Sequence, residues 1–423
     1  MKRFLSVLLV AAMICALLPT LALAEEETTL RVMWWGSQTR HDRTMAAIAK
    51  FEEKNPGVKV DAEFTSFDEY WRKLATQVAG NQVPDVIQMG YTYLIQYANS
   101  GVLADLKPYF ESGTIDVSDV AESVIASGQV DGHIYALSTG TNCLATFYRK
   151  DVADAAGVEV PMDLTYEKVI ELSKTVYEKT GRTNNIPIDL DAVRLYVRSR
   201  GMQLYNEEGT ALGFDDPKYI ADLWQMRVDG LKEGWILDSG STTATTAFDN
   251  LISDCWMNQH YSNELQAYQD GNGVTLEMVM YPVVEGGTVP PAFFKPSMFW
   301  SISEKSNVKD VAARFIDFFT NDPDCFDIMG LDRAMPVSAK IREYLIPTFD
   351  DVSKRTAALL DYLGQEGKSS PIMKPDVAAH GEIMALFAEY MEQVNYGMVD
   401  DLTAFAQQFM DEANELITKS LAK

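Results

Sequence analysis

Cysteine and histidine are scarce in this sequence, with four residues of each type among 423. Cys15 lies in an apolar leader, so the remaining thiols are Cys143, Cys255 and Cys325, and an odd number allows at most one disulfide with a thiol left over. The histidines lie far apart, and the spacings match no metal motif. The sequence therefore predicts no disulfide framework, no metal and no cofactor, and we expect the three cysteines to be small buried apolar side chains.

Positive charge is also in deficit, because 36 Lys and Arg residues stand against 61 Asp and Glu, a net charge of −25. An acidic excess of this size argues against nucleic acid or an anionic membrane as a partner. Hydrophobic residues at 47% and charged residues at 23% are typical of a folded globular chain. A chain of 423 residues exceeds one simple core, so we expect two or three domains or lobes.

Long apolar runs are absent except near the N-terminus, at Phe4–Leu18, where a short basic start precedes the run. The small residues of Ala22-Leu23-Ala24 follow, which predicts a secretory signal peptide cleaved after Ala24. A lipid anchor at Cys15 is disfavoured, since Ile14 stands where a lipoprotein signal has a small residue. We therefore expect an exported protein, either periplasmic or extracellular.

Strands and helices alternate at the start of the mature chain. Three strand-like segments are each followed by a helical pattern: 30–35, 58–64 and 85–89 for the strands, and 39–54, 68–80 and 92–100 for the helices. Such alternation predicts a mostly parallel sheet with helices on both faces. Ligands of these sheets bind at the carboxyl ends of the strands, here 34–36, 65–67 and 89–91.

A second α/β region begins near residue 140. Helices are expected at 166–180, 191–204, 217–233 and 309–320, strands at 274–283 and 297–303, and a helical stretch from about 376 to the end. No repeat or low-complexity linker marks a boundary. We therefore expect two lobes joined by several chain crossings.

Eight segments in a fixed order carry a family resemblance: LRVMWWG, AIAKFEEKNPGVKV, VPDVIQMG, GVLADLKPYF, DGHIYALSTG, FYRKDVADAAGVEVP, SMFWSISEKSNVKDVAARFIDFFTND and MPVSAK. With them the whole mature chain resembles the extracellular solute-binding proteins of bacterial carbohydrate ABC importers, which include maltose-binding protein. WWGSQTRHDRT, FDEYWRKLA and KPSMFW are most similar to binders of plant-polysaccharide and pectin oligosaccharides. One segment departs from the family: DNLISDCW stands where many members have a Gly-Lys-Ala-Ala-Met-like run before a tryptophan.

The resemblance implies an α/β, periplasmic-binding-protein-like fold. Two lobes would enclose a ligand cleft and be joined by two or three hinge crossings, the first at 135–140. After the signal peptide at 1–24, lobe one would hold 25–137 plus 276–330. Lobe two would hold 138–275 plus 331–423.

Sugars present apolar C–H faces to aromatic rings and a rim of hydroxyls to planar polar groups. On this basis the predicted ligand contacts in lobe one are Trp34, Trp35, Gln38, Arg40, His41, Phe67, Asp68, Tyr91 and Tyr93. Ser297 and Trp300, in the second part of lobe one, are also predicted contacts, and in the part assigned to lobe two they are Asn142, Trp256, Asn258, Arg333 and His380. Packing is the alternative for the tryptophans, since neighbours in a strand point to opposite faces, and helix capping is the alternative for Asp68.

A cationic cluster of Arg40, His41 and Arg43 stands in the first turn of the first expected helix. Cations there oppose the helix dipole, so local stability does not explain them. An acidic sugar such as galacturonate would pair with them. The alternative is solvated charge neutralised by Asp42.

The resulting prediction is a non-catalytic, monomeric receptor that traps an oligosaccharide by lobe closure and delivers it to an ABC permease. One alternative is a receptor of the same fold for another solute, such as a polyamine, whose site would have carboxylates and aromatic rings. The other is an exported glycoside hydrolase, which needs two carboxylates at a set separation. No segment places such a pair at strand ends.

Overall fold

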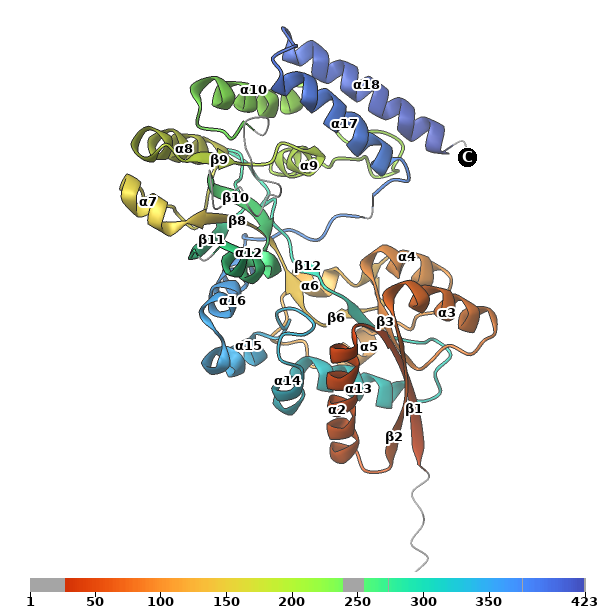
Figure 1. Ribbon diagram of the computed structural model, residues 1–423. Coiled ribbons are helices and arrows are strands. Elements are labelled where there is room, and N and C mark those ends of the chain that lie inside the picture. The colour runs from red at the N-terminus through yellow and green to blue at the C-terminus, as the bar shows by residue number, and fades with distance from the viewer. Residues whose placement is uncertain (1–26, 239–254, 273, 375, 422–423) are drawn as a thin grey trace, which may run out of the picture.

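The computed structural model describes residues 27–238, 255–272, 274–374 and 376–421. The predicted signal peptide lies outside this range. Two α/β lobes, each built on its own sheet, lie one above the other in Figure 1. This is the fold class that the sequence predicts.

Lobe one contains a five-stranded sheet in the order β2-β1-β3-β13-β6. Its strands are β1 (Thr28–Trp35), β2 (Val58–Thr65), β3 (Val86–Met89), β6 (Leu137–Ser138) and β13 (Phe299–Ile302). Strand β1 is parallel to β2 and β3, and β13 is antiparallel to β3. Its helices are α2 (Gln38–Lys54), α3 (Phe67–Ala79), α4 (Tyr91–Asn99), α5 (Lys107–Glu111), α6 (Glu122–Ala126), α13 (Lys309–Asn321) and α14 (Pro323–Met329). The last four residues of β1 are all buried, as expected for a strand covered on both faces.

Lobe two contains a four-stranded sheet in the order β11-β8-β10-β9. Its strands are β8 (Leu144–Arg149), β9 (Thr183–Asn185), β10 (Cys255–Tyr261) and β11 (Leu276–Met280). The helices around it are α7 (Lys150–Ala156), α8 (Tyr166–Thr180), α9 (Leu190–Arg198), α10 (Lys218–Glu233), α12 (Leu265–Asn272), α16 (Asp351–Leu363), α17 (His380–Asn395) and α18 (Leu402–Leu421). Helix α15 (Ala339–Leu345) contacts α14 of lobe one instead. Figure 1 shows α17 and α18 side by side at the top of this lobe.

Three extended segments cross between the lobes and contact one another. Strand β7 (Thr141–Asn142) pairs with β12 (Lys295–Pro296), and Thr141 also bridges to Met335 on the third segment. Gly140 allows this approach, because a Cβ there would lie 2.1 Å from the carbonyl oxygen of Arg333. The crossings therefore form one packed hinge.

The expected division at residue 276 assigns β11 to lobe one, but β11 pairs with β8 in the second sheet. We therefore propose boundaries at the three crossing segments, so that β11 belongs to lobe two.

Most expected helices form, and α8 has the predicted bounds of Tyr166–Thr180. The helix expected at 191–204 is wrong at its end, because α9 stops at Arg198 and Gly201 adopts a left-handed φ of 80°. The helical stretch expected from 376 consists of two helices, α17 and α18. The turn between them contains Gly397, whose φ is 65°.

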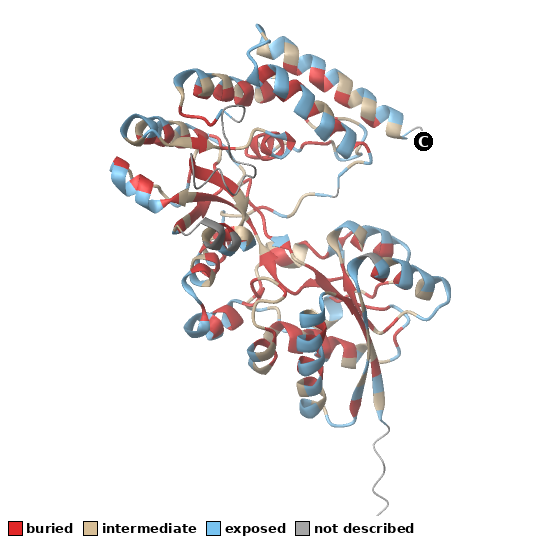
Figure 2. Cartoon of the chain, in the orientation of Figure 1, coloured by how far each residue is buried: buried red, intermediate tan, exposed pale blue. Residues whose placement is uncertain are grey.

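The inner strands of both sheets, such as β3, β13 and β10, are mostly buried, whereas the edge strand β2 and the outer faces of the helices are largely exposed or half-buried (Figure 2). Among the described residues, Cys143, Cys255 and Cys325 form no disulfide and are buried, in agreement with their expected role as apolar side chains. Across the described ranges, every helix is too short or too polar to cross a membrane.

Candidate functional site

The carboxyl ends of β1, β2 and β3 lie on the side of lobe one that faces lobe two, where α3 and α4 begin (Figure 1). Four aromatic side chains gather there, and we call them the lobe-one aromatic cluster: Trp35, Phe67, Trp71 and Tyr93. Trp71 stacks on Tyr93 with ring centroids 3.7 Å apart, and Phe67 lies 5.5 Å from Trp35. Because Phe67 is 50% exposed, this cluster offers an apolar ring at the lobe surface.

The adjacent tryptophans of β1 point to opposite faces of the sheet. Trp34 is fully buried, and its Nε1 donates to His41 Nδ1 at 3.1 Å. Trp35 is 8% exposed and packs edge-on against Tyr70. The prediction that Trp34 stacks on a sugar is therefore corrected, because helices cover both faces of this strand and leave it no open face.

The side chains of Arg40, His41 and Arg43, which follow the two tryptophans in the sequence, already contact other residues of the protein. Arg40 Nε donates to Asp332 at 2.7 Å, and Arg43 donates to the Met329 carbonyl at 3.3 Å. His41 is buried against Phe64, with ring centroids 4.4 Å apart, and burial lowers the pKa of its imidazole. These contacts hold α2 against the segment that leads into the third crossing.

Arg333 and Trp300 are packing residues, which corrects both as predicted ligand contacts. Arg333 is 6% exposed and donates to Gln88 Oε1 and to Thr44 Oγ1. Its guanidinium lies 4.9 Å from the ring centroid of Trp300, which is fully buried. A buried cation stacked on an indole and bonded to two elements fixes lobe one beside the hinge.

Three further predicted ligand contacts form hydrogen bonds or strand pairs at the crossing segments or between the lobes. The Ser297 hydroxyl lies within hydrogen-bond distance of the carbonyl oxygens of Gly140 and Arg333, at 2.9 and 2.7 Å, and its one proton can be donated to either. Asn142 pairs with Lys295 in the two-stranded crossing. The Tyr91 hydroxyl donates to the carbonyl of Met373, a residue of the segment between α16 and α17.

The other predicted ligand contacts are divided between buried strand positions and the starts of helices. Trp256 and Asn258 are buried in β10, so neither is open to a ligand in this structure. Gln38 donates to Asp42 at the exposed start of α2, and Tyr93 stacks in the lobe-one aromatic cluster. His380 begins α17, 2.7 Å from the Tyr205 hydroxyl. The side chain of Asp68 lies outside those the structure describes.

A pocket of about 350 Å³ opens on lobe two where β9, β10 and β11 end. We call it the β10 pocket; it is lined by Leu144, Pro187, Asp189, Asp191, Ala192, Arg194, Leu195, Gln259, His260, Tyr261, Glu264, Tyr281, Phe293, Met373 and Asp376. Its volume is in the range of small-ligand sites, and it combines rings with convergent polar groups. Tyr91 of lobe one bonds to Met373 on its wall, which places this pocket beside the facing lobe.

Charges in the β10 pocket are mostly acidic. Arg194 forms ion pairs with Asp191 at 3.1 Å and with Asp376 at 2.7 Å. Burial lowers the pKa of His260 to about 4, so the imidazole is neutral at pH 7. Burial raises the pKa of both Asp189 and Glu264.

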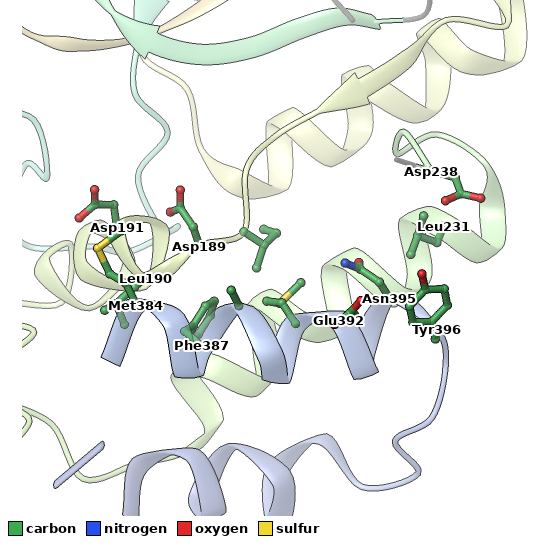
Figure 3. A pocket seen from close by; sticks show the side chains of 13 residues that line it. Asp189, Leu190, Asp191, Leu231, Asp238, Met384, Phe387, Glu392, Asn395 and Tyr396 are labelled. Carbon is green, nitrogen blue, oxygen red and sulfur yellow. The ribbon is translucent and has the colours of Figure 1, made fainter. Parts of the chain in front are cut away.

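A larger pocket of about 860 Å³ continues from it and shares Asp189 and Asp191. Figure 3 shows Met384 and Phe387 of α17 below the start of α9, with Leu231, Asn395 and Tyr396 toward the other end. A third pocket of about 320 Å³ shares Arg194, Met373 and Asp376 with the β10 pocket. The start of α9 is therefore at the centre of a continuous hollow surface on lobe two.

Sequence reasoning missed the residues that line the β10 pocket. One signal was present: Asp189 precedes the apolar run of α9 and caps it, its carboxylate accepting from Ala192 N at 2.8 Å. The walls contributed by Glu264, Met373 and Asp376 come from segments that only tertiary structure brings together. Among the described side chains, no group of three or more His, Cys, Asp or Glu residues is arranged to hold a metal ion.

Comparison with known proteins identifies relatives of one kind. The sequence model for bacterial extracellular solute-binding proteins matches residues 46–358. The chain is 29% identical over 210 residues to the diacetylchitobiose binding protein DasA of Streptomyces coelicolor, which covers 48% of this chain and 45% of that protein. The chain spans about half the length of the curated relatives it matches, between 42% and 53%.

Solved structures agree over nearly the full chain. A family 1 extracellular solute-binding protein from Alicyclobacillus acidocaldarius is 27% identical with a TM-score of 0.84, covering 92% of this chain and 98% of that one. A periplasmic oligogalacturonide binding protein from Yersinia enterocolitica is 19% identical with a TM-score of 0.77, covering 93% of this chain and 100% of that one. The second likeness shows the fold alone.

Proposed function

The chain belongs to the bacterial extracellular solute-binding proteins, and from this premise we propose that it is an exported receptor for an oligosaccharide. It would bind the sugar between its lobes as a monomer and deliver it to the membrane subunits of an ABC transporter, without catalysing a reaction. The relative named for diacetylchitobiose binding supports the saccharide class.

The observation that carries the proposal is the composition of the β10 pocket. Tyr261, Tyr281 and Phe293 supply rings, while Gln259 and Asp189 supply planar polar groups. This is the combination that saccharides require, since rings cover their C–H faces and planar groups bind their hydroxyls. The exposed ring of Phe67 on lobe one would supply a second surface for the same ligand.

Closure of the lobes would give selectivity. A ligand that contacts both lobes binds the closed arrangement better than the open one and shifts the population toward it. The three crossings would form the hinge, and lobe one would bring Phe67 and the start of α4 onto the β10 pocket. The closed form would then be recognised by the permease.

A receptor for a polyamine is the second candidate, and the acidic walls of the β10 pocket favour it. The ligand panel of the test therefore includes spermidine.

The experiment is titration calorimetry of the purified protein with neutral oligosaccharides, oligogalacturonides and spermidine. We predict that an oligosaccharide binds and that Phe67→Ala and Tyr261→Ala each weaken it about tenfold, or ~1.4 kcal/mol. Tyr344→Ala is the matched control, since Tyr344 is 45% exposed on α15, away from the pocket. Binding of spermidine without any saccharide would overturn the proposal.

A further inference from the structure

We propose that the ligand carries a protonated amine, and that this amine binds in the β10 pocket beside Asp189, Glu264 and Gln259. The inference rests on the proposed function for its setting, since it assigns a chemical class to the ligand of the same cleft. It reverses the expectation of an acidic sugar that the cations of α2 suggested.

The first argument is the balance of charge in the pocket. Four carboxylates line it, from Asp189, Asp191, Glu264 and Asp376, against the single guanidinium of Arg194. Arg194 is already paired with Asp191 and Asp376. Two carboxylates, those of Asp189 and Glu264, are therefore left to interact with a ligand.

Neighbouring groups only partly satisfy these two carboxylates. Asp189 accepts a backbone hydrogen bond from Ala192 at the start of α9, and Glu264 lies 3.2 Å from the imidazole of His260, which is neutral at pH 7. Lys295 lies near Glu264, with its ammonium 3.6 Å from the ring centroid of Tyr261, and it lowers the pKa of Glu264. The pKa of Glu264 and that of Asp189 nevertheless stay raised, because burial outweighs this compensation. An added cation would relieve that cost.

The second argument is independent of charge. Gln259 lines the pocket and is 5% exposed, yet neither its amide oxygen nor its amide nitrogen has a hydrogen-bond partner among the described residues. An unpaired buried amide costs free energy that a bound polar group can recover. Its oxygen can accept from an ammonium group, as the nearby carboxylates can.

A uronate is disfavoured by the same features. Its carboxylate would enter a pocket with four carboxylates, where like charges repel each other strongly. On lobe one, Arg40 would have to release Asp332 to pair with it. An amine needs neither change, and the rings of Tyr261 and Phe293 can pack on the apolar faces of the sugar that carries it.

The test compares glucosamine oligomers with their N-acetylated counterparts at pH 6, because the two share a backbone and differ, at each sugar, in whether the nitrogen is a charged amine or a neutral acetamide. Calorimetry on the purified protein should give a Kd at least about tenfold lower for the amine form, a difference of ~1.4 kcal/mol. Glu264→Gln should remove most of that preference. Glu178→Gln, an exposed carboxylate on α8, is the matched control and should leave both affinities unchanged.

The outcomes separate this inference from the proposed function. Equal affinity for the two forms, or tighter binding of oligogalacturonides, overturns the amine assignment and leaves the oligosaccharide receptor intact. Binding of spermidine with no oligosaccharide supports the amine and overturns the saccharide. Retained preference in a folded Glu264→Gln variant, checked by its melting temperature, overturns the role of this pocket.

Discussion

His260 is a residue whose chemistry is set by its surroundings. Its ring lies within hydrogen-bond distance of the Tyr268 hydroxyl, and its side chain is 19% exposed. Burial lowers its pKa from 6.5 to about 4. The folded protein therefore holds it neutral where an unfolded chain would begin to protonate it.

This depressed pKa makes stability depend on pH. At pH 7 both states are neutral at this position, and as the pH falls from 6.5 to about 4 the unfolded state binds a proton that the folded state does not. The loss is about 3 kcal/mol by pH 4. Urea unfolding of wild type and His260→Gln at pH 7 and pH 4 should show that the variant loses less stability than wild type by that amount. Parallel losses in the two proteins would contradict the assignment.

The sequence predicts which residue types lie at the strand ends, but it does not predict which side chains they contact in the fold. Trp34 and Trp35 are where the sequence predicts aromatic rings, at the carboxyl end of a strand. The pairing of Arg40 with Asp332 joins residues 292 positions apart, so nothing local predicts that this cation is occupied. For this reason the sequence alone assigns the positive charge of Arg40 to a ligand, whereas in the folded protein Arg40 pairs with Asp332.

The crossing segments are the elements on which the two-lobe arrangement depends. Gly140 packs against the backbone of the third crossing, and its Cβ would lie 2.1 Å from one carbonyl oxygen and 3.1 Å from another, those of Arg333 and Met335. The hydroxyl of Ser297 lies within hydrogen-bond distance of carbonyl oxygens of both neighbouring segments. Backbone atoms cannot yield as a flexible side chain can, so this contact admits only glycine.

Gly140→Ala should therefore destabilise the protein by about 3 kcal/mol, the upper part of the range for overpacking. Gly381→Ala is the control, because its Cβ would meet no atom within 4 Å in helix α17, and alanine there should be neutral or slightly stabilising. Chemical denaturation measures both. A Gly140→Ala variant as stable as wild type would show that the crossings separate more easily than their packing indicates.

Regular elements were predicted better than their ends. The hydrophobic periodicity of α8 and α13 gives their bounds to within a residue. The end of α9 and the break between α17 and α18 coincide with left-handed glycines at 201 and 397, and hydrophobic periodicity does not report backbone φ. The β10 pocket was missed for a related reason, since its walls come from stretches of chain that lie far apart in the sequence, from Leu144 to Asp376.

At the scale of the whole molecule, the proposed mechanism divides the ligand contacts between the two lobes. Lobe one presents the exposed ring of Phe67, and lobe two presents the hollow surface around the start of α9. In the proposed mechanism the saccharide contacts both surfaces, which makes closure of the lobes part of binding. A net charge of −25 leaves the molecule acidic overall, in keeping with the acidic β10 pocket.

Small-angle X-ray scattering of the purified protein, with and without the oligosaccharide that calorimetry shows to bind, tests the central claim most directly. We predict that the radius of gyration falls when that saccharide is bound and stays unchanged with a saccharide that does not bind. An unchanged radius of gyration at saturating ligand would contradict capture between the lobes.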